Sequence, residues 1–375
     1  MFDIVLADFT PEFTWTESGE ASNFVASSME PIMNSVPKRV VTILLALASG
    51  VGLIGSHSAA NKPRVRTFHL EYKANLSGLS GGAKRVDLWV PVPHHDPWQH
   101  VTNLTVQSTN TYEIAKAANG NEILHIGVNN PTALVTVSIS LEAARNEHIQ
   151  PALRGEQVAI QNESQRQLAV YLKPDRLVPI DEQIRSWAQE VVDKANAHTD
   201  LEKARAIYDH VVSTVKYDKS GHGWGRGDIY YACQARRGNC TDFHAIFIGY
   251  CRVLGIPARF AIGFPLPLKR GHGIIAGYHC WAEFYAKNIG WVPVDASEAA
   301  KNQLQREYFF GAHDENRIEF SKDRDLALTP RQQGELLNYF IYPYAEVDGR
   351  SYTKVGYEVA YRDQISGTTG SPSSR

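Results

Sequence analysis

Three residues of this chain, Cys240, His279 and Asp295, are of the types that form a nucleophilic triad. In such a triad an imidazole takes the proton of a thiol, and a carboxylate orients the imidazole. The residue types alone prove little, because a chain of 375 residues is expected to contain all of them. A buried cysteine, a half-buried sheet histidine and an aspartate that caps a strand end are the ordinary alternatives. The local sequence around each residue therefore decides the case.

Cys240 lies at the predicted start of a helix. Apolar residues recur every three or four positions over 240–254, which predicts a helix with one apolar face that includes Cys251. Asn239 is a good amino-terminal cap, and the segment 255–257 contains the Gly and Pro of a stop signal. The first turn of a helix has free N–H groups and the positive end of the helix dipole, and both favour a thiolate. The same N–H groups would stabilise an oxyanion.

Two strands are predicted to carry His279 and Asp295. Residues 278–285 alternate in the way of a strand, and a turn at 288–290 follows them. The next segment, 291–295, is a second strand that would pair with the first in antiparallel register. An imidazole and a carboxylate would then meet across two paired strands.

Four segments together resemble the transglutaminase-like superfamily of papain-like cysteine enzymes: GNCTDFH at 238–244, GIPAR at 255–259, HCWAEFY at 279–285 and GWVPVDASE at 290–298. The resemblance covers roughly residues 180–300. It implies that Cys240 is the nucleophile, His279 the general base and acid, and Asp295 the orienting carboxylate. It also implies an α+β fold, in which the helix that bears the cysteine packs on an antiparallel sheet that bears the other two residues.

The resemblance leaves the acyl acceptor open, since the superfamily contains peptidases, amidases, protein-crosslinking enzymes and inactive members. The complete set of three residues argues against an inactive member. The sequence has no acidic calcium loop of the DxDxDG kind. We expect an exported peptidase or amidase that forms an acyl-enzyme and hydrolyses it with water. The alternatives are a protein-glutamine γ-glutamyltransferase that crosslinks proteins, and a non-catalytic binding module of the cell envelope.

Other residues are assigned to the site by their position near the cysteine. Gln234 resembles the glutamine that supplies an oxyanion donor in papain-like proteases, and an exposed loop glutamine is the alternative. The glycine-rich stretch 223–231 lacks the lysine and the strand context of a phosphate-binding loop. We expect it to form a substrate-facing wall through Trp224 and Asp228, and we assign Trp281 to the same cleft.

The composition is that of an ordinary globular protein, with 43% hydrophobic and 21% charged residues. The net charge of −2 indicates no general attraction to nucleic acid or to an anionic membrane. The four cysteines lack CxxC spacing, and His94 and His95 are interpreted as loop residues. An oxidising compartment would allow one disulfide among Cys233, Cys251 and Cys280. We expect no metal and no cofactor, and we expect a peptide or protein as the substrate.

Residues 1–60 are predicted to lie outside the folded protein. A basic pair, fifteen uncharged residues and small residues near Ala60 follow one another, as in a secretory signal with a cleavage site. The uncharged run is short for a membrane span, which needs about 20 residues. Residues 1–32 contain six acidic side chains and no Lys or Arg, so we interpret them as the product of a mis-assigned start and 33–60 as the signal. The alternative is a genuine cytosolic extension with a short signal anchor.

This interpretation predicts a periplasmic or secreted bacterial protein, with no stable membrane span after processing. The rest of the chain divides into successive parts. Residues 64–145 contain strand-like segments between Gly, Asn and Pro breaks, which predicts a small β-sandwich-like domain. Residues 165–300 are the expected catalytic core, with two amphipathic helices before the cysteine. Residues 301–364 are expected to be a C-terminal extension, and 365–375 a disordered tail.

Overall fold

Alternation of apolar and polar residues shapes the longest strands of the protein. In β1 (Val65–Leu76) and β6 (Val135–Asn146) every second side chain is buried, because neighbouring side chains in a strand point to opposite faces of the sheet. The structure is a computed structural model that describes residues 63–79, 81–131, 134–156 and 163–364. The expected amino-terminal leader and the expected C-terminal tail lie outside this part of the chain.

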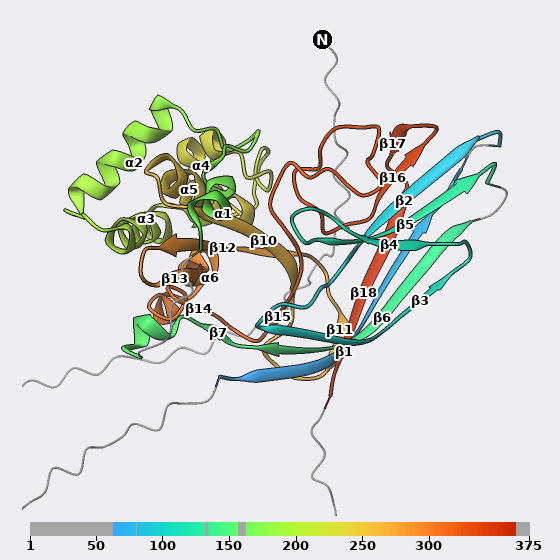
Figure 1. The fold of residues 1–375 in the computed structure, drawn as a ribbon, viewed down its shortest axis with the longest axis horizontal. Helices are drawn as coiled ribbons and strands as arrows, with labels where there is room; N and C mark the ends of the chain where they lie inside the picture. The colour runs from blue at the N-terminus through green and yellow to red at the C-terminus, as the bar shows by residue number, and fades with distance from the viewer. Residues whose placement is uncertain (1–62, 80, 132–133, 157–162, 365–375) are drawn as a thin grey trace, which may run out of the picture. The chain divides into compact units, whose positions relative to one another are not determined.

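Two five-stranded antiparallel sheets form a β-sandwich (Figure 1). One sheet has the strand order β11-β18-β1-β6-β3, and the other has the order β17-β16-β2-β5-β4. Phe68 of β1 and Leu88 of β2 belong to one hydrophobic cluster between them, which confirms the predicted all-β domain. The other strands of the sandwich are β2 (Arg85–Val92), β3 (Gln99–Ser108), β4 (Glu113–Lys116), β5 (Glu122–Asn129), β11 (His272–Ile274), β16 (Tyr344–Val347), β17 (Arg350–Tyr352) and β18 (Val355–Asp363).

The sandwich is not complete within residues 64–145, which differs from the expected division of the chain. Its last three strands come from the segment that was expected to be a separate extension, and β18 pairs with β1 along its whole length. Arg66 of β1 donates hydrogen bonds of 2.8 and 2.9 Å to the carboxylate of Asp363 in β18. Strands that pair in a sheet can lie far apart in the sequence, so a linear reading cannot place this boundary.

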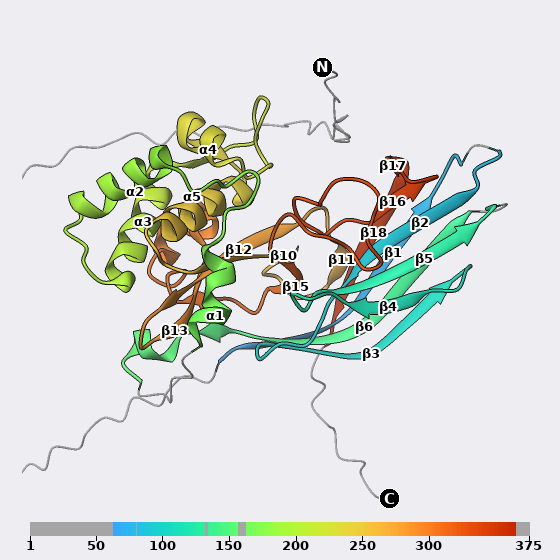
Figure 2. The same cartoon turned by 45° about the horizontal axis from the view of Figure 1, so that its top comes forward.

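The second part is an α+β core in which helices cover a four-stranded antiparallel sheet of order β13-β12-β10-β15 (Figure 2). The central helix, α5 (Cys240–Val253), is buried along its whole length rather than on one face, because it lies between the sheet and the other helices. The strands of this sheet are β10 (Ala258–Pro265), β12 (His279–Ala286), β13 (Gly290–Val294) and β15 (Arg317–Lys322). The helices around α5 are α2 (Glu182–Lys194), α3 (Asp200–Thr214), α4 (Ile229–Ala235) and α6 (Ala296–Lys301).

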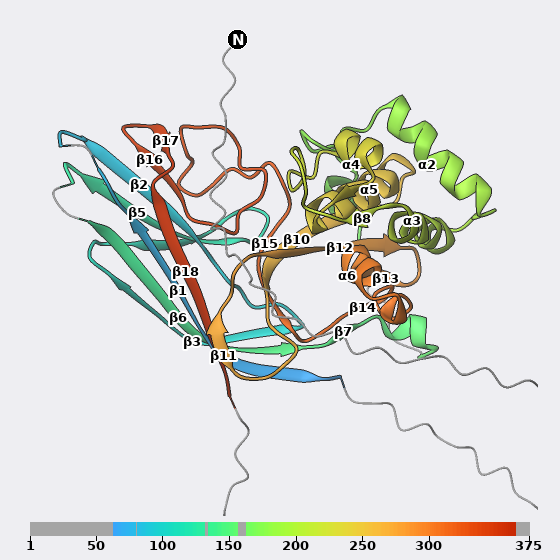
Figure 3. The same cartoon turned by 180° about the vertical axis from the view of Figure 1, so that it is seen from behind.

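Short elements connect these two parts. The strand pair β7 (His148–Ile149) and β14 (Ala312–His313) lies below β10 and β12, whereas α2 to α5 lie above them (Figures 1 and 3). Strand β11 comes from the loop that precedes His279 and pairs with β18 of the sandwich. The remaining short elements are α1 (Gln165–Leu168), β8 (Lys216–Tyr217), β9 (Arg237–Gly238) and three 3-10 turns at Pro151–Arg154, Ala169–Leu172 and Gln303–Gln305.

Gly263 allows β10 to approach β15 beside His279. The pairing of β10 with β15 shifts register between Ile262 and Gly263, and Gly263 lies opposite His279 in the pairing with β12. A Cβ on Gly263 would lie 1.8 Å from the carbonyl oxygen of Ile318. No side chain fits there, so this glycine sets the spacing of the sheet at the point where His279 enters it.

We expect Gly263→Ala to destabilise the fold by about 3 kcal/mol, because the obstacle is backbone and cannot rotate away. Urea denaturation followed by circular dichroism measures this change. Gly271→Ala is the matched control, since a Cβ there meets nothing within 4 Å and the loss of glycine freedom in the unfolded chain is mildly stabilising. Equal unfolding free energies for the two variants would contradict the proposed close approach.

Candidate active site

Cys240 is the first residue of α5, as the sequence predicted. The side chain of Asn239 accepts a hydrogen bond of 2.9 Å from the amide of Thr241. Asp242 in turn accepts one of 2.9 Å from the amide of Asn239, which completes a capping box. The Cys240 side chain is only 1% exposed, so it lies at the positive end of a buried helix dipole that water screens little. This position favours a thiolate.

Strands β12 and β13 bring His279 to Asp295. The strands are antiparallel neighbours, and Nε2 of His279 lies 2.7 Å from Oδ2 of Asp295. Asp295 is not part of the strand, which differs from the expected range. It is the amino-terminal cap of α6 and accepts a 3.0 Å hydrogen bond from the amide of Glu298. The carboxylate therefore caps a helix and orients an imidazole at once.

Asp295 has a second cationic partner, Arg317 of β15, which the sequence did not reveal. The Nη1 atom of Arg317 lies 2.9 Å from Oδ2 of Asp295, and the hydroxyl of Ser297 donates to Oδ1 at 3.1 Å. Burial alone would raise the pKa of Asp295, but the charges of His279 and Arg317 hold it well below its usual range. The site thus contains a fixed negative charge next to the imidazole. Arg317 lies outside every recognisable motif, so no sequence signal indicated it.

The charges of the thiol and the imidazole are coupled. Burial opposes ionisation of Cys240, yet hydrogen bonds from Cys280 and His279 and the charge of His279 hold the pKa of this thiol well below its usual value. Burial would lower the pKa of His279, but the charge and hydrogen bond of Asp295, together with Cys240, raise it to about 10. These shifts favour a thiolate–imidazolium pair at neutral pH. A cysteine nucleophile is most reactive in this form.

Asp242 ties a glycine-rich loop to the start of α5. Its carboxylate accepts hydrogen bonds from the amides of Gly225 at 2.7 Å and Gly227 at 3.1 Å. Both glycines have positive φ angles, a conformation in which glycine is the favoured residue. Burial raises the pKa of Asp242 to about 6, although the backbone hydrogen bonds oppose this shift. The sequence showed the loop and the aspartate as separate features, and only the fold connects them.

Tyr278 joins the start of α5 to the start of β12. Its hydroxyl accepts a 2.9 Å hydrogen bond from Nδ2 of Asn239 and lies 3.0 Å from Oγ1 of Thr241. The ring of Tyr339, which comes from the C-terminal part of the chain, lies 5.5 Å from that of Tyr278. The segment after the core therefore contributes to the surroundings of the site.

Two of the expected site residues lie on α4. Asp228 is the amino-terminal cap of this helix and accepts hydrogen bonds from the amides of Tyr230 and Tyr231. This contact gives it a structural task, and its expected place in a substrate cleft stays a prediction. Gln234 is exposed on the helix, and among the described residues no hydrogen bond connects it to Cys240. Its expected role as an oxyanion donor stays a prediction.

The two tryptophans assigned to the cleft have different surroundings. Trp224 is half-buried, and its indole N–H donates to the carbonyl of Gly221 at 3.1 Å. Trp281 is buried within the sheet, where the guanidinium of Arg317 lies 4.9 Å from its ring. Its contacts support the partner of Asp295, which differs from the expected position on a cleft wall.

The other cysteines differ from Cys240 in their ionisation, and all four are free thiols in the structure. Cys251 is fully buried, as predicted, and burial raises its pKa. Cys280 is also buried, and burial and the thiolate of Cys240 raise its pKa. Cys233 is partly exposed, and burial raises its pKa to about 11. Cys240 is thus the cysteine with the lowered pKa among these four.

Comparisons with known proteins agree with the α+β fold of the core. The model of the transglutaminase-like superfamily matches residues 185–296, the segment that contains all three residues of the candidate triad. A candidate cysteine protease from Cytophaga hutchinsonii has a similar fold, with a TM-score of 0.55 and 16% sequence identity over 80% of this chain and 92% of that chain.

A second comparison finds a relative of nearly the same extent. An uncharacterized protein from Haemophilus influenzae is 26% identical over 349 residues, which cover 82% of this chain and 94% of the relative. The similarity thus extends over both the sandwich and the core. Residues 185–296 of the chain thus form a domain that matches the model of the transglutaminase-like superfamily.

Proposed function

We propose that this protein is a cysteine-dependent acyl-transfer enzyme that hydrolyses an amide or peptide bond through Cys240, His279 and Asp295. The observation that carries the proposal is the 2.7 Å contact between His279 and a buried, ionised Asp295, next to a thiol with a lowered pKa. Perturbed ionisation within such a cluster is typical of a reactive site. The likeness in fold to a candidate cysteine protease supports the same reading.

In the proposed reaction, the thiolate of Cys240 attacks the carbonyl carbon of the substrate, and a C–S bond forms. The carbonyl oxygen takes up the negative charge, and the amides at the start of α5 are suited to stabilise it. The C–N bond then breaks, and His279 gives its proton to the leaving amine. Water attacks the resulting thioester while His279 takes a proton from it. The C–S bond breaks, the acid product leaves, and the thiolate–imidazolium pair is restored.

The proposed acceptor is water, and the proposed substrate is a peptide, cell-wall peptide included. A peptide library with and without an added primary amine tests this choice, with the products identified by mass spectrometry. Free acids in both reactions support a hydrolase. Amine conjugates as the main product would favour the crosslinking alternative. No product in either reaction, together with an unreactive Cys240, would favour a binding module.

We expect Cys240→Ser and His279→Ala each to lower kcat/KM by at least about 1,000-fold, because the triad acts as a unit. Asp295→Asn should leave weak activity, since the nucleophile stays while the imidazole loses its orientation. It should also lower the melting temperature, because the buried Arg317 would lose one of its two carboxylate partners and keep only Asp314. Steady-state kinetics and thermal melts measure both effects. Rates near wild type in all three variants would refute the mechanism.

Alkylation by iodoacetamide tests whether the ionisation of a thiol or its exposure decides which cysteine reacts first. Cys240 has the lowered pKa but is buried, whereas Cys233 is more exposed and has a pKa of about 11. A thiol is protonated only below its pKa, so Cys240 should keep its reactivity as the pH falls from about 8 to about 6, while that of Cys233 falls about tenfold per pH unit. Mass spectrometry after short labelling times identifies the modified residue. Modification of Cys233 ahead of Cys240 at about pH 6 would contradict the activated thiol.

Export to the periplasm or beyond is proposed from the signal-like pattern before residue 60. None of the helices in the described part of the chain is long and apolar enough to cross a membrane. Sequencing of the amino terminus of the native protein should give a mature chain that begins near Asn61. Because β1, the first strand of the described residues, starts at Val65, cleavage there would leave every described strand in the mature chain. A cytoplasmic protein that retains residues 1–32 would refute the proposal.

A further inference from the structure

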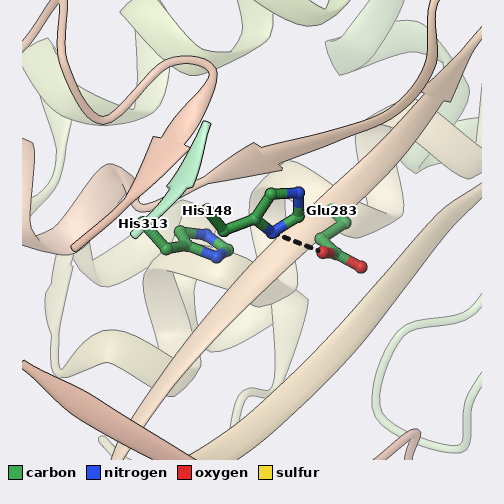
Figure 4. Close-up of side chains that lie close together, drawn as sticks. All are labelled: His148, Glu283 and His313. Atoms are coloured by element: carbon green, nitrogen blue, oxygen red, sulfur yellow. Dashed lines mark ion pairs between the residues drawn. The ribbon is translucent and has the colours of Figure 1, made fainter. Parts of the chain in front are cut away.

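A cluster of metal-ligand side chains lies on the face of the core sheet away from α5. Along β12 the side chains alternate, so Phe284 packs on Phe247 of α5 at 6.0 Å while Glu283 points to the other face. There it meets His148 of β7 and His313 of β14 (Figure 4). The two histidines lie directly opposite each other in the β7–β14 pair. The exposed fractions are 5% for His148, 8% for Glu283 and 0% for His313.

His313, a member of this cluster, has a buried ring nitrogen with a bare lone pair. Its Nε2 lies 3.1 Å from the carbonyl oxygen of Val294 and must donate the hydrogen bond. In the neutral ring the proton then resides on Nε2, and Nδ1 is an acceptor. This Nδ1 is buried, and no hydrogen-bond partner in the described residues reaches it.

The other two side chains have suitable atoms free. His148 has two ring nitrogens, which are the usual metal-binding atoms of a histidine. The ring stacks on Trp98 at 4.1 Å, and its Nδ1 lies 3.4 Å from Oε1 of Glu283. Oε2 of Glu283 is occupied by Arg259, which leaves Oε1 for a second partner. Arg259 thereby serves as a support that orients the carboxylate.

The guanidinium groups near the cluster each have a carboxylate partner, although Nε of Arg145, whose Nη1 lies 3.5 Å from Asp96, has no hydrogen-bond partner among the described residues. Arg259 pairs with Glu283, and Arg317 pairs with Asp295. A neighbouring group, formed by His94, Asp96 and Glu319, also has ligand-type atoms close together. In that group the ammonium of Lys322 lies 3.1 Å from Oε1 of Glu319, so a cation is present. The His148 group has no such ammonium at its centre among the described contacts.

We propose that His148, Glu283 and His313 bind a divalent transition-metal ion of the zinc class. Two imidazoles and one carboxylate are a known ligand set for such ions, with a fourth position left for water. The three ligand atoms lie within 4.8 Å of one another, and small side-chain rotations bring them to the spacing of roughly 3.3 Å found around zinc. A cavity of about 420 Å³ adjoins His148 and Glu283 and offers the open side.

The ion would join three strands that hydrogen bonds alone connect loosely. The β7–β14 pair consists of two residues on each strand, and β12 is the strand that begins with His279. Binding would therefore hold β7 and β14 against β12, the strand that positions the imidazole of His279. The inference rests on the cluster itself and holds whether or not the chain is a hydrolase.

Metal analysis and titration of the tag-free protein test this site. Elemental analysis of the purified protein, and zinc titration of chelator-treated protein, should give one ion per chain and a raised melting temperature. In a Cys240→Ser background, which removes the reactive thiol as a ligand, His148→Gln and His313→Gln should each weaken zinc binding at least about 100-fold. His125→Gln is the matched control, because His125 is a buried histidine that contacts two carboxylates, Asp87 and Glu113, away from this cluster.

Several results would overturn the assignment. One is the absence of stoichiometric zinc binding by the wild-type protein, and another is unchanged affinity in both cluster variants. Loss of the ion in His94→Gln instead would place it in the neighbouring group. Where a variant fails to fold, X-ray absorption at the zinc edge identifies the ligands of the ion in the unmodified protein. Two imidazole ligands without sulfur support the site, and a sulfur ligand places the ion at Cys240 and refutes it.

Discussion

The buried carboxylate of Asp295 is the constraint on which the rest of the structure depends. An ionised carboxylate removed from water costs several kcal/mol unless partners compensate for the lost hydration. Here the partners are His279 at the start of β12, Arg317 on β15, and Ser297 and the amide of Glu298 on α6. These groups come from three elements, so one charge ties the sheet and the helix after it into a single arrangement. The ionisation of the thiol follows, because the carboxylate holds the imidazolium that stabilises the thiolate.

The path of the chain explains how Arg317 reaches this carboxylate. After α6 the chain adds β15 to the edge of the core sheet beside β10, and it then returns to the sandwich as β16 to β18. In the other direction, β11 leaves the core just before His279 and pairs with β18. The chain thus passes back and forth between the sandwich and the core, and neither is a continuous stretch of sequence. A destabilising substitution in β16, β17 or β18 would therefore affect the surroundings of the candidate active site as well as the sandwich.

The cluster of His148, Glu283 and His313 behind the core sheet is connected to the candidate active site. Trp281 lies between the two, with Arg317 4.9 Å from its ring and the ring of His313 at 5.8 Å. His313 also holds the carbonyl of Val294, the residue before Asp295. A buried polar group in a protein interior is usually satisfied, and one that is not requires an explanation. The bare Nδ1 of His313 is such a group, and its neighbours are of the kinds that share a metal ion.

The sequence by itself determined the elements that carry the candidate triad. Helical period and the cap at Asn239 placed Cys240 in a first turn, and alternation with a turn placed His279 near Asp295, because these signals arise from contacts between residues close in sequence. The tertiary structure decided the rest. Arg317 beside the carboxylate, the hold of Asp242 on the glycine loop, and the cluster around His313 all depend on segments that share no local pattern. Periodicity in the sequence indicates that one face of an element is buried. It does not indicate which segment covers that face, because this depends on how distant strands pair and on how buried charges are compensated.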